Sequence, residues 1–409
     1  MLETKEPKVK KISNGTVVTP KGFSADGVHA GLRHAKKDIG IVLSEVPANS
    51  AAVYTKSHFQ APPLKVTQES IAKDGLLQAI IVNSAIANAC TGEQGLKDAY
   101  EMRASCAKKF NLKDEHVAVA STGVIGEYLK MDKINKGISE LNPTADESGA
   151  EAFQTAILTT DLVMKTSCYE VEIDGKKVVI GGTSKGSGMI HPNMATMLAF
   201  VTTDAKISSS ALHKALREIT DVSFNQITVD GETSTNDMVV VMANGLAENN
   251  ELTETHPQWS HFTQALQIVC EELAKQIAKD GEGATKLIEV EVKGAESKED
   301  ANIAAKKIVG SSLVKTAVYG ADANWGRIIG AVGHSDVSVN PDKIEIYLED
   351  ICMFTNNSPQ PFDEEAAKKC LENDKVKITV NLGIGEASGR AWGCDLTYDY
   401  IKINASYRT

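Results

Sequence analysis

The segment from residue 181 to residue 200 holds the side chains with the clearest chemical potential. Four glycines fall within residues 181–188, and they lead through His191-Pro192-Asn193 into an apolar run that begins after Thr196. Glycine allows backbone conformations and close approaches that other residues avoid, while proline restricts its neighbour. A loop of this composition can hold strained backbone immediately before Thr196.

Strain at that point would favour an intramolecular reaction. The hydroxyl of Thr196 can attack the carbonyl of Ala195, and hydrolysis of the resulting ester makes Thr196 a new N-terminus. Its α-amine, with an ordinary pKa of about 7.7–8.0, would then be a suitable general base at neutral pH. Base and nucleophile would belong to one residue, so no catalytic histidine is required. We therefore expect His191 to structure the loop.

Other interpretations of the same segment stay open at this level. Ala195-Thr196 before Met-Leu-Ala-Phe is also an ordinary pattern for the start of a strand. A phosphate-binding loop is disfavoured, because Lys185 precedes Gly186 and no Ser or Thr follows a Gly-Lys pair. The spacing alone is suggestive of self-cleavage and no more.

Composition limits the classes of protein. A chain of 409 residues exceeds one hydrophobic core, so two lobes or two intertwined layers are expected. The net charge of -11 disfavours a nucleic-acid partner. Seven cysteines without a CxxC pair indicate reduced thiols and no zinc site. No stretch is long and apolar enough for a membrane span, and the N-terminus lacks a signal-peptide pattern, so we expect a cytoplasmic protein.

Strand-like and helix-like segments alternate along the whole chain. Asp174-Gly175 predicts a hairpin between residues 171–173 and 177–180. Apolar residues recur with helical spacing from Phe262 to Ile277. The pattern predicts a mixed α/β (α+β) fold of layered sheets and helices. Further strands are expected at residues 287–292, 343–348, 376–381 and 394–403, and further helices at residues 362–371 and after an N-cap at Ser210.

The residues from Lys185 to Leu198 resemble the self-cleavage site of the ornithine acetyltransferase family, which are glutamate N-acetyltransferases of arginine biosynthesis. Further blocks occur in the family's order, so the resemblance covers essentially the whole chain. They are Ser121-Thr-Gly-Val-Ile-Gly126, Leu158-Thr-Thr-Asp161, Thr228-Val-Asp-Gly-Glu-Thr-Ser-Thr-Asn-Asp237, Gly281-Glu-Gly-Ala-Thr-Lys-Leu287 and Gly320-Ala-Asp-Ala-Asn-Trp-Gly-Arg327.

The resemblance implies two chains made from one precursor. Cleavage between Ala195 and Thr196 would give an α chain, residues 1–195, with the oxyanion hole and part of the substrate site. The β chain, residues 196–409, would begin with the nucleophile. The resemblance also implies an assembly of two α and two β chains, a heterotetramer. The implied fold has layered sheets flanked by helices, resembling self-processing aminopeptidases and, by convergence, N-terminal nucleophile hydrolases.

The resemblance also implies roles for single residues. Thr196 matches the nucleophile, and Thr122 and Gly123 match the oxyanion-stabilising pair, although alone they would suggest a simple turn. Lys185 is hypothesised to pair with a substrate carboxylate and Glu282 with an ammonium group. Glu232 and Asp237 stay unassigned. The family's substrate-binding positions correspond to Thr159, Lys185, Thr196, Glu282, Asn404 and Thr409.

The implied reaction transfers the acetyl group of N2-acetyl-L-ornithine to L-glutamate through acetyl-Thr196, with ping-pong kinetics. No metal ion or bound organic cofactor is expected. Some family members also accept acetyl-CoA as donor, and we expect this second activity here. Two alternatives stay open: a self-processed amidase or aminopeptidase that passes the acyl group to water, and an uncleaved amino-acid-binding protein.

Overall fold

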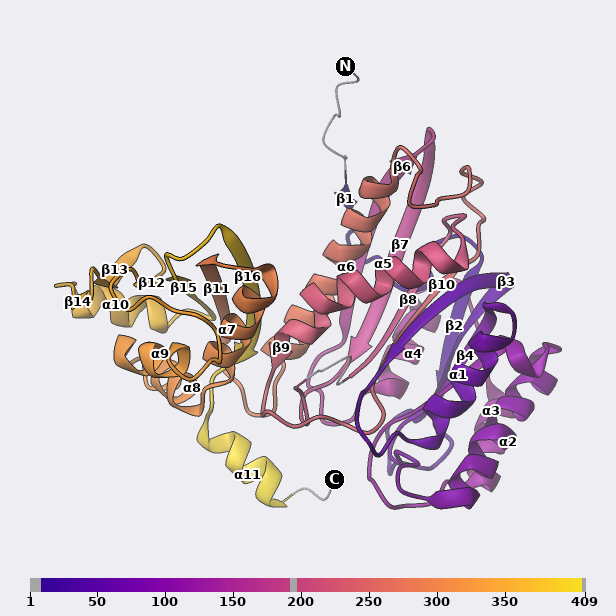
Figure 1. Cartoon of the computed structure of the whole chain (residues 1–409). Helices are drawn as coiled ribbons and strands as arrows, with labels where there is room; N and C mark the ends of the chain where they lie inside the picture. The colour runs from indigo at the N-terminus through magenta and orange to yellow at the C-terminus, as the bar shows by residue number, and fades with distance from the viewer. Residues whose placement is uncertain (1–8, 192–196, 407–409) are drawn as a thin grey trace.

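The computed structural model describes residues 9–191 and 197–406. These residues form two lobes, each built on its own sheet (Figure 1). The larger lobe contains a nine-stranded sheet and the smaller lobe a seven-stranded sheet. The expectation of two lobes from chain length is thus confirmed, as is the mixed α/β class with layered sheets. Within the described residues, no helix combines the length and apolar character that crossing a membrane requires.

The sheet of the large lobe mixes parallel and antiparallel pairs. Its order is β1-β6-β7-β8-β10-β3-β4-β5, and β2 pairs with β3. The central strands β8 and β10 are parallel, and β7 runs antiparallel to β8. The strands are β1 Lys10–Lys11, β2 Phe23–Val28, β3 Ile39–Tyr54, β4 Leu76–Asn83, β5 Val117–Ser121, β6 Lys165–Ile173, β7 Lys176–Lys185, β8 Leu198–Thr203 and β10 Met238–Ala243.

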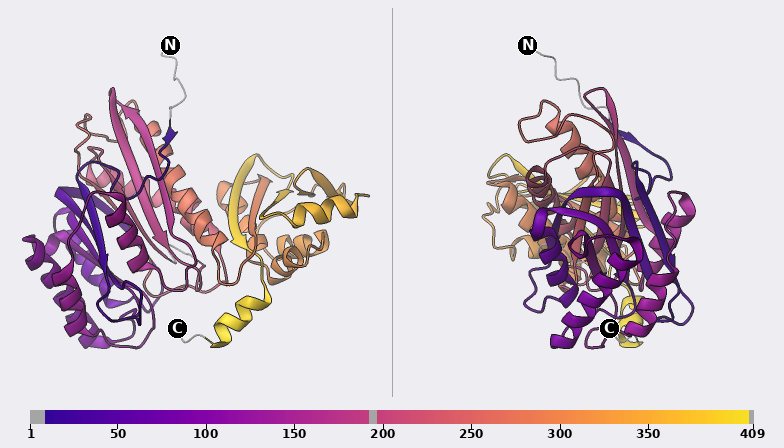
Figure 2. Two further views of the ribbon diagram at one scale, coloured as in Figure 1. Left: turned by 180° about the vertical axis from the view of Figure 1, so that it is seen from behind. Right: turned by 90° about the vertical axis from the view of Figure 1, so that its right-hand side faces the viewer.

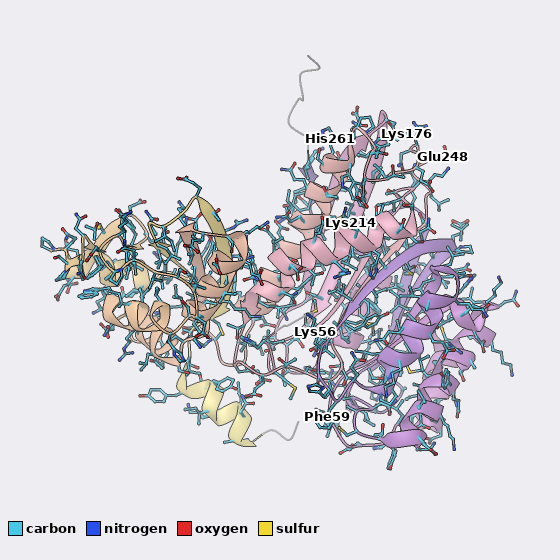
Figure 3. All side chains as sticks on the ribbon, in the orientation of Figure 1. Lys56, Phe59, Lys176, Lys214, Glu248 and His261 are labelled. Atoms are coloured by element: carbon cyan, nitrogen blue, oxygen red, sulfur yellow. The ribbon has the colours of Figure 1, made fainter. Side chains whose placement is uncertain are left out.

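Helices cover both faces of this sheet. Alternate residues of β8 face opposite ways: Phe200 packs against Phe153 of α4, whereas Val201 joins the apolar cluster of α5 and α6. Charged side chains occupy the outer surface, such as Lys214 on α5, and Lys176 lies at the far tip of the lobe (Figure 3). The helices are α1 Pro62–Asp74, α2 Gly92–Phe110, α3 Met131–Glu140, α4 Glu147–Ile157, α5 Ser209–Val222 and α6 Trp259–Lys279, with short 3-10 turns at Asp114–His116 and Phe224–Gln226.

The small lobe follows α6 in the chain, and Figure 2 shows it from two further sides. Its sheet has the order β14-β13-β12-β15-β11-β16-β9. Strand β9 comes from the chain segment between α5 and β10, and it pairs in parallel with β16, so the two lobes are joined through a shared sheet. The elements are β9 Ile227–Thr228, β11 Leu287–Ala295, β12 Glu345–Leu348, β13 Ile351–Thr355, β14 Ser358–Pro359, β15 Lys375–Asn381, β16 Ala387–Cys394, α7 Lys298–Gly310, α8 Ser312–Tyr319, α9 Trp325–Val332 and α10 Glu364–Leu371.

The strongest local sequence signals are confirmed. Strands β6 and β7 form the predicted hairpin, with Asp174 and Gly175 both at positive φ (52° and 72°), as its two-residue turn requires. Helix α6 buries the stripe that begins at Phe262 and ends at Ile277. The predicted strands at residues 287–292 and 376–381 correspond to β11 and β15, and that at residues 343–348 to β12.

The predicted strand at residues 394–403 is wrong. Strand β16 ends at Cys394, and helix α11, Tyr398–Ser406, follows. The hydroxyl oxygen of Thr397 accepts hydrogen bonds from the N–H groups of Asp399 (3.2 Å) and Tyr400 (3.3 Å), which is how an N-cap begins a helix. Helix α11 buries none of its residues, so its sequence carries no apolar stripe with helical spacing.

Two helix starts also differ from prediction by one turn or less. The N-cap of α5 is Ser208, whose hydroxyl accepts from the N–H of Ala211, and not Ser210. Helix α10 begins at Glu364 behind the capping carboxylate of Asp363, two residues later than expected. In both cases another capping side chain stands nearby in the sequence, and only the local backbone path selects between them.

Candidate active site

A cavity of about 270 Å³ lies where several elements of both lobes end. Its wall includes residues after β5, at the end of β7, at the start of β8, before β10, after α6 and on α11. It brings together, from distant parts of the sequence, the six described residues that the family resemblance singled out, namely Thr122, Gly123, Thr159, Lys185, Glu282 and Asn404. Ala195, Thr196 and Thr409 lie outside the described residues. Met197, which follows Thr196, also lines this cavity.

The loop after β5 is fixed in a conformation that only glycine permits. Gly123 has φ +133°, and a Cβ there would lie 2.1 Å from the carbonyl carbon of Ala85. The flanking N–H groups are used: Thr122 donates to Asn83 (3.0 Å) and Val124 to Ala85 (2.9 Å). The N–H of Gly123 meets no protein acceptor in the part of the chain that the structure describes. A rigid loop with one unused donor suits the binding of a developing negative charge.

The ammonium group of Lys185 lies beside that loop. Its Nζ donates to the hydroxyl oxygen of Thr122 (3.2 Å), and the side chain is almost fully buried. Burial lowers the pKa of Lys185, and the negative charges of Asp161 and Glu282 act in the opposite direction. A desolvated cation in a small cavity is a strong receptor for a carboxylate.

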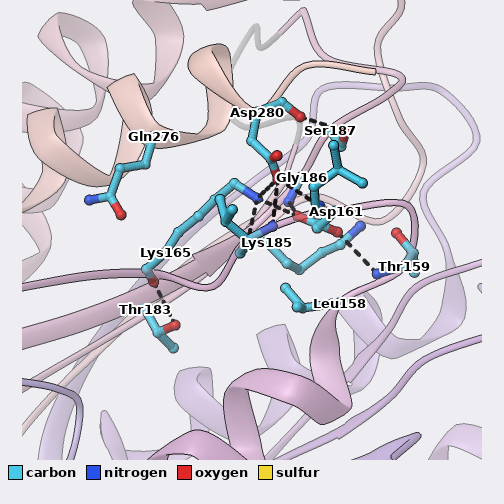
Figure 4. A network of polar contacts seen from close by, with 12 residues as sticks. Leu158, Thr159, Asp161, Lys165, Thr183, Lys185, Gly186, Ser187, Gln276 and Asp280 are labelled. Atoms are coloured by element: carbon cyan, nitrogen blue, oxygen red, sulfur yellow. Dashed lines mark hydrogen bonds and ion pairs between the residues drawn. The ribbon is translucent and has the colours of Figure 1, made fainter. Parts of the chain in front are cut away.

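Lys165 is the centre of a buried ion network that supports this wall (Figure 4). Its Nζ lies 2.7 Å from Oδ1 of Asp161 and 2.5 Å from Oδ2 of Asp280, and its side chain is fully buried. The carboxylate of Asp161 also accepts the N–H groups of Gly186 (2.7 Å) and Thr159 (3.0 Å). Burial acts to raise the pKa of Asp161, but the ammonium groups of Lys185 and Lys165 outweigh it and hold that pKa well below its usual range.

Glu282 lines the cavity from the segment that follows α6. Its N–H donates to the carbonyl of Ser187 (3.0 Å), and its carboxylate accepts the side-chain amide of Asn404 on α11 (2.9 Å). Gly188 packs so closely that a Cβ there would lie within 2.5 Å of the carboxyl group. Glu282 is therefore a buried cavity residue, not a solvated loop carboxylate, and Asn404 lies on a helix rather than at a strand end.

Asp237 is a cavity residue that the sequence interpretation left unassigned. Its side chain is 3% exposed, and its Oδ2 has no hydrogen-bond partner among the described residues. Burial raises the pKa of Asp237 well above its usual value, while hydrogen bonds from Ser234 and the charge of Lys185 act in the opposite direction. The available signal was a carboxyl residue directly before the buried apolar run of β10. Glu232 also lines the cavity but is exposed.

His191 does not line this cavity, although it is close to the predicted cleavage site in sequence. Its Nδ1 is 2.9 Å from the hydroxyl of Thr228, and its carbonyl accepts from Thr233 (3.1 Å). Burial, together with the charge of Lys306, lowers the pKa of His191 to about 4, so the ring is neutral at physiological pH. These contacts favour the loop-structuring role.

The fold and cavity define a two-lobed α/β protein with a small, charged cavity for a small molecule. The family model described as ArgJ matches residues 24–409, and the chain belongs to this family. It is 68% identical over 410 residues to the arginine biosynthesis bifunctional protein ArgJ of Geobacillus kaustophilus, with 100% of both chains covered. Identity to the protein of the same name from Bacillus subtilis is 65% over 409 residues, again with full coverage of both.

Two solved structures with related sequences match about half of the chain. One is the arginine biosynthesis bifunctional protein from Bacillus halodurans, 58% identical, covering 47% of this chain and 100% of that one with a TM-score of 0.46. The other is ornithine acetyltransferase from Mycobacterium tuberculosis in complex with ornithine, 32% identical, covering 46% of this chain and 100% of that one with a TM-score of 0.43.

The ion network gives a test of the cavity wall. Replacing Lys165 by Met removes the buried cation that Asp161 and Asp280 share, and we expect a loss of about 3–5 kcal/mol in the free energy of unfolding. Replacing Lys177 by Met removes an exposed pair with Glu170 and should cost less than about 1 kcal/mol. Urea unfolding of both variants measures the difference. Equal losses would contradict the role given to the Lys165 network.

Proposed function

We propose that this chain is a glutamate N-acetyltransferase of arginine biosynthesis. It moves the acetyl group of N2-acetyl-L-ornithine to L-glutamate, releasing L-ornithine and N-acetyl-L-glutamate. The observation that carries this proposal is the meeting of the six described family residues in one cavity beside Met197. The family membership and the full-length similarity to proteins named for arginine biosynthesis support it.

Maturation is part of the proposal. The precursor cleaves itself between Ala195 and Thr196, giving chains of residues 1–195 and 196–409. Thr196 is bonded to Met197, a residue of the cavity wall, so a nucleophile at position 196 is within one residue of the substrate space. Residues of both product chains line the cavity: Thr122 and Lys185 come from the first, and Glu282 and Asn404 from the second. The two chains would therefore stay associated.

The chemistry follows from the groups around the cavity. The free α-amine of Thr196 takes the proton of its own hydroxyl, and Oγ attacks the acetyl carbonyl. The unused N–H of Gly123 and the hydroxyl of Thr122 stabilise the oxyanion. Because Lys185 already donates to the Thr122 oxygen, the proton of that hydroxyl is left to point at the oxyanion. A donor of this kind contributes about 3 kcal/mol to lowering the barrier.

Substrate selection rests on charge and size. A cavity of about 270 Å³ suits an amino acid, and it offers a cation, Lys185, and an anion, Glu282, from different walls. Lys185 pairs with a substrate carboxylate and Glu282 with an ammonium group. Both amino acids use this one cavity in turn, so ornithine must leave before glutamate enters. Since base and nucleophile belong to Thr196, the reaction requires no metal ion or organic cofactor.

Two further features complete the proposal. The enzyme also acetylates glutamate from acetyl-CoA, an activity that the word bifunctional in the names of its relatives supports. The mature protein is a cytoplasmic heterotetramer of two α and two β chains that acts on small molecules and binds neither nucleic acid nor membrane. The net charge of -11 is consistent with a protein that does not bind nucleic acid.

The self-cleavage step is tested with Thr196→Ala. Without the hydroxyl, neither the backbone attack nor acyl transfer can occur, so the variant should run as one full-length band on denaturing electrophoresis and lack transfer activity. The unchanged protein should give two bands of similar size. The serine variant keeps a hydroxyl and serves as the matched control for cleavage. A Thr196→Ala protein that still divides into two fragments would contradict the mechanism.

The shared acyl-enzyme is tested by initial rates over a grid of donor and acceptor concentrations. With acetylornithine and glutamate, double-reciprocal plots should give parallel lines, because the two substrates never occupy the cavity together. With acetyl-CoA as the only donor, N-acetylglutamate should still form. Intersecting lines would count against the acetyl-Thr196 intermediate. Rapid release of acetate without any acceptor would favour an amidase instead.

A further inference from the structure

The proposed reaction leaves one proton without a carrier. When acetylornithine acylates Thr196, the hydroxyl proton passes through the α-amine of Thr196 to the departing nitrogen. That nitrogen becomes an amine, yet free ornithine carries an ammonium group in neutral water, so a second proton must be supplied. Glutamate arrives with an ammonium group and must lose a proton before it can attack. A second proton-exchanging group beside the reacting atoms would serve both half-reactions.

Asp237 has the position that such a group needs. It directly precedes β10, whose first residue Met238 donates its N–H to the carbonyl of Met197 (3.0 Å) and pairs with Leu198. Asp237 therefore lies directly before β10, and β10 pairs with β8, the strand that follows Thr196 and Met197 in the sequence. Its buried side chain lines the cavity, and its Oδ2 has no partner among the described residues.

The backbone around Asp237 is tied to the oxyanion loop. The side-chain amide of Asn236 donates to the carbonyls of Ala87 (2.6 Å) and Ser121 (2.9 Å), and Ser121 directly precedes Thr122. The carbonyl of Asp237 accepts the N–H of Thr55 (3.0 Å). These bonds hold the Asp237 carboxyl in a fixed relation to the groups that bind the acetyl oxygen, as a proton donor to the adjacent nitrogen requires.

The other carboxyls of the described cavity wall are less suited to this task. Asp230 uses both of its oxygens to accept the N–H groups of Met189 (2.7 Å) and Ile190 (2.9 Å). Glu282 accepts the amide of Asn404. Glu232 lies at the exposed rim, where solvent exchanges protons freely. Among the described carboxyls of this wall, Asp237 alone has a fully buried oxygen that accepts no hydrogen bond.

We propose that Asp237 stores the proton that the two half-reactions exchange. This inference rests on the proposed function. In the first step the amide C–N bond breaks, the ester bond to Thr196 Oγ forms, and the proton of the Asp237 carboxyl moves to the leaving amine. Ornithine departs as an ammonium ion, and Asp237 is left as a carboxylate. Glutamate then returns a proton from its ammonium group to Asp237, its amine attacks the ester, and Oγ regains its own proton through the α-amine.

The electrostatics of the cavity support this cycle. Burial raises the pKa of Asp237, which favours the form that holds the proton, while the hydrogen bonds from Ser234 and the Lys185 ammonium act in the opposite direction and limit the cost of the carboxylate stage. The incoming ammonium group of glutamate adds a second positive charge beside it. The titratable groups that line the cavity with Asp237 are Lys185 of β7, Asp230 and Glu232 of the preceding loop, Glu282 after α6 and Tyr400 of α11. Tyr54 of β3 pairs with Met238, the residue after Asp237.

The test compares two acceptors in Asp237→Asn, which keeps the shape of the side chain but cannot exchange a proton. Acetyl-enzyme is formed with acetylornithine, freed of ornithine by gel filtration, and mixed with L-glutamate or hydroxylamine. Hydroxylamine is uncharged at neutral pH, so it has no ammonium proton that must be removed before it can attack. In the variant, deacetylation by glutamate should be slower by about 100-fold, the scale of acid–base catalysis. Deacetylation by hydroxylamine should stay within about threefold of the unchanged enzyme.

Asp204→Asn is the matched control. Asp204 is also buried with a raised pKa, chiefly through desolvation, but it follows the far end of β8 and accepts the N–H of Val179 (2.8 Å). It does not line the cavity. Both acceptors should react with this variant within about threefold of the normal rates. Denaturing electrophoresis and thermal melting confirm that each variant is processed and folded.

The outcomes separate the two proposals. Equal losses with both acceptors would show a structural role for Asp237 and overturn the inference, as would an unchanged rate with glutamate. If the unchanged enzyme forms no acetyl-enzyme, the proposed function fails instead. If the Asp237→Asn variant does not fold, the inference is tested by measuring proton uptake from solution while the unchanged enzyme is acetylated. Acetylation by acetylornithine should take no proton from an indicator-containing solution, and uptake of one proton per acetyl-enzyme would overturn the inference.

Discussion

The buried ammonium group of Lys165 is the interaction on which the cavity depends. A fully desolvated cation is tolerated only when anions surround it, and here Asp161 and Asp280 supply them from a loop and from the end of α6. Asp161 in turn fixes the N–H groups of Thr159 and Gly186, next to Lys185. This charge cluster therefore aligns segments that are more than 100 residues apart in the sequence. In doing so it positions the residues that face the substrate.

Two aspartates beside this cavity show how the surroundings decide the state of one functional group. Asp161 and Asp237 are both buried, and burial alone raises a carboxyl pKa. Asp161 receives two ammonium groups and two backbone N–H groups, so it stays ionised and structural. Asp237 keeps a buried oxygen without a hydrogen-bond partner among the described residues, and burial raises its pKa well above the usual value. Asp161 therefore stabilises the cavity wall, whereas Asp237 is available for proton transfer.

Local signals in the sequence predicted the parts of the fold that local physics determines. The Asp174-Gly175 turn and the apolar stripe of α6 need no information from elsewhere in the chain. Helix α11 was missed because it buries nothing and so lacks a stripe. The family blocks predicted which residues share the cavity. The partners of Asp161 and the burial of the Asp237 carboxyl depend on contacts between distant segments, which no short pattern contains.

The proposed mechanism depends on an acetyl group that is bonded to Thr196, the first residue of the second chain. Intact mass spectrometry of purified protein, before and after brief exposure to acetylornithine, measures this most directly. We predict fragments of residues 1–195 and 196–409, with one acetyl group added to the second fragment alone and removed again by glutamate. A protein that transfers acetyl groups at full rate while residues 1–409 stay intact, or while the second fragment stays unmodified, would contradict the account.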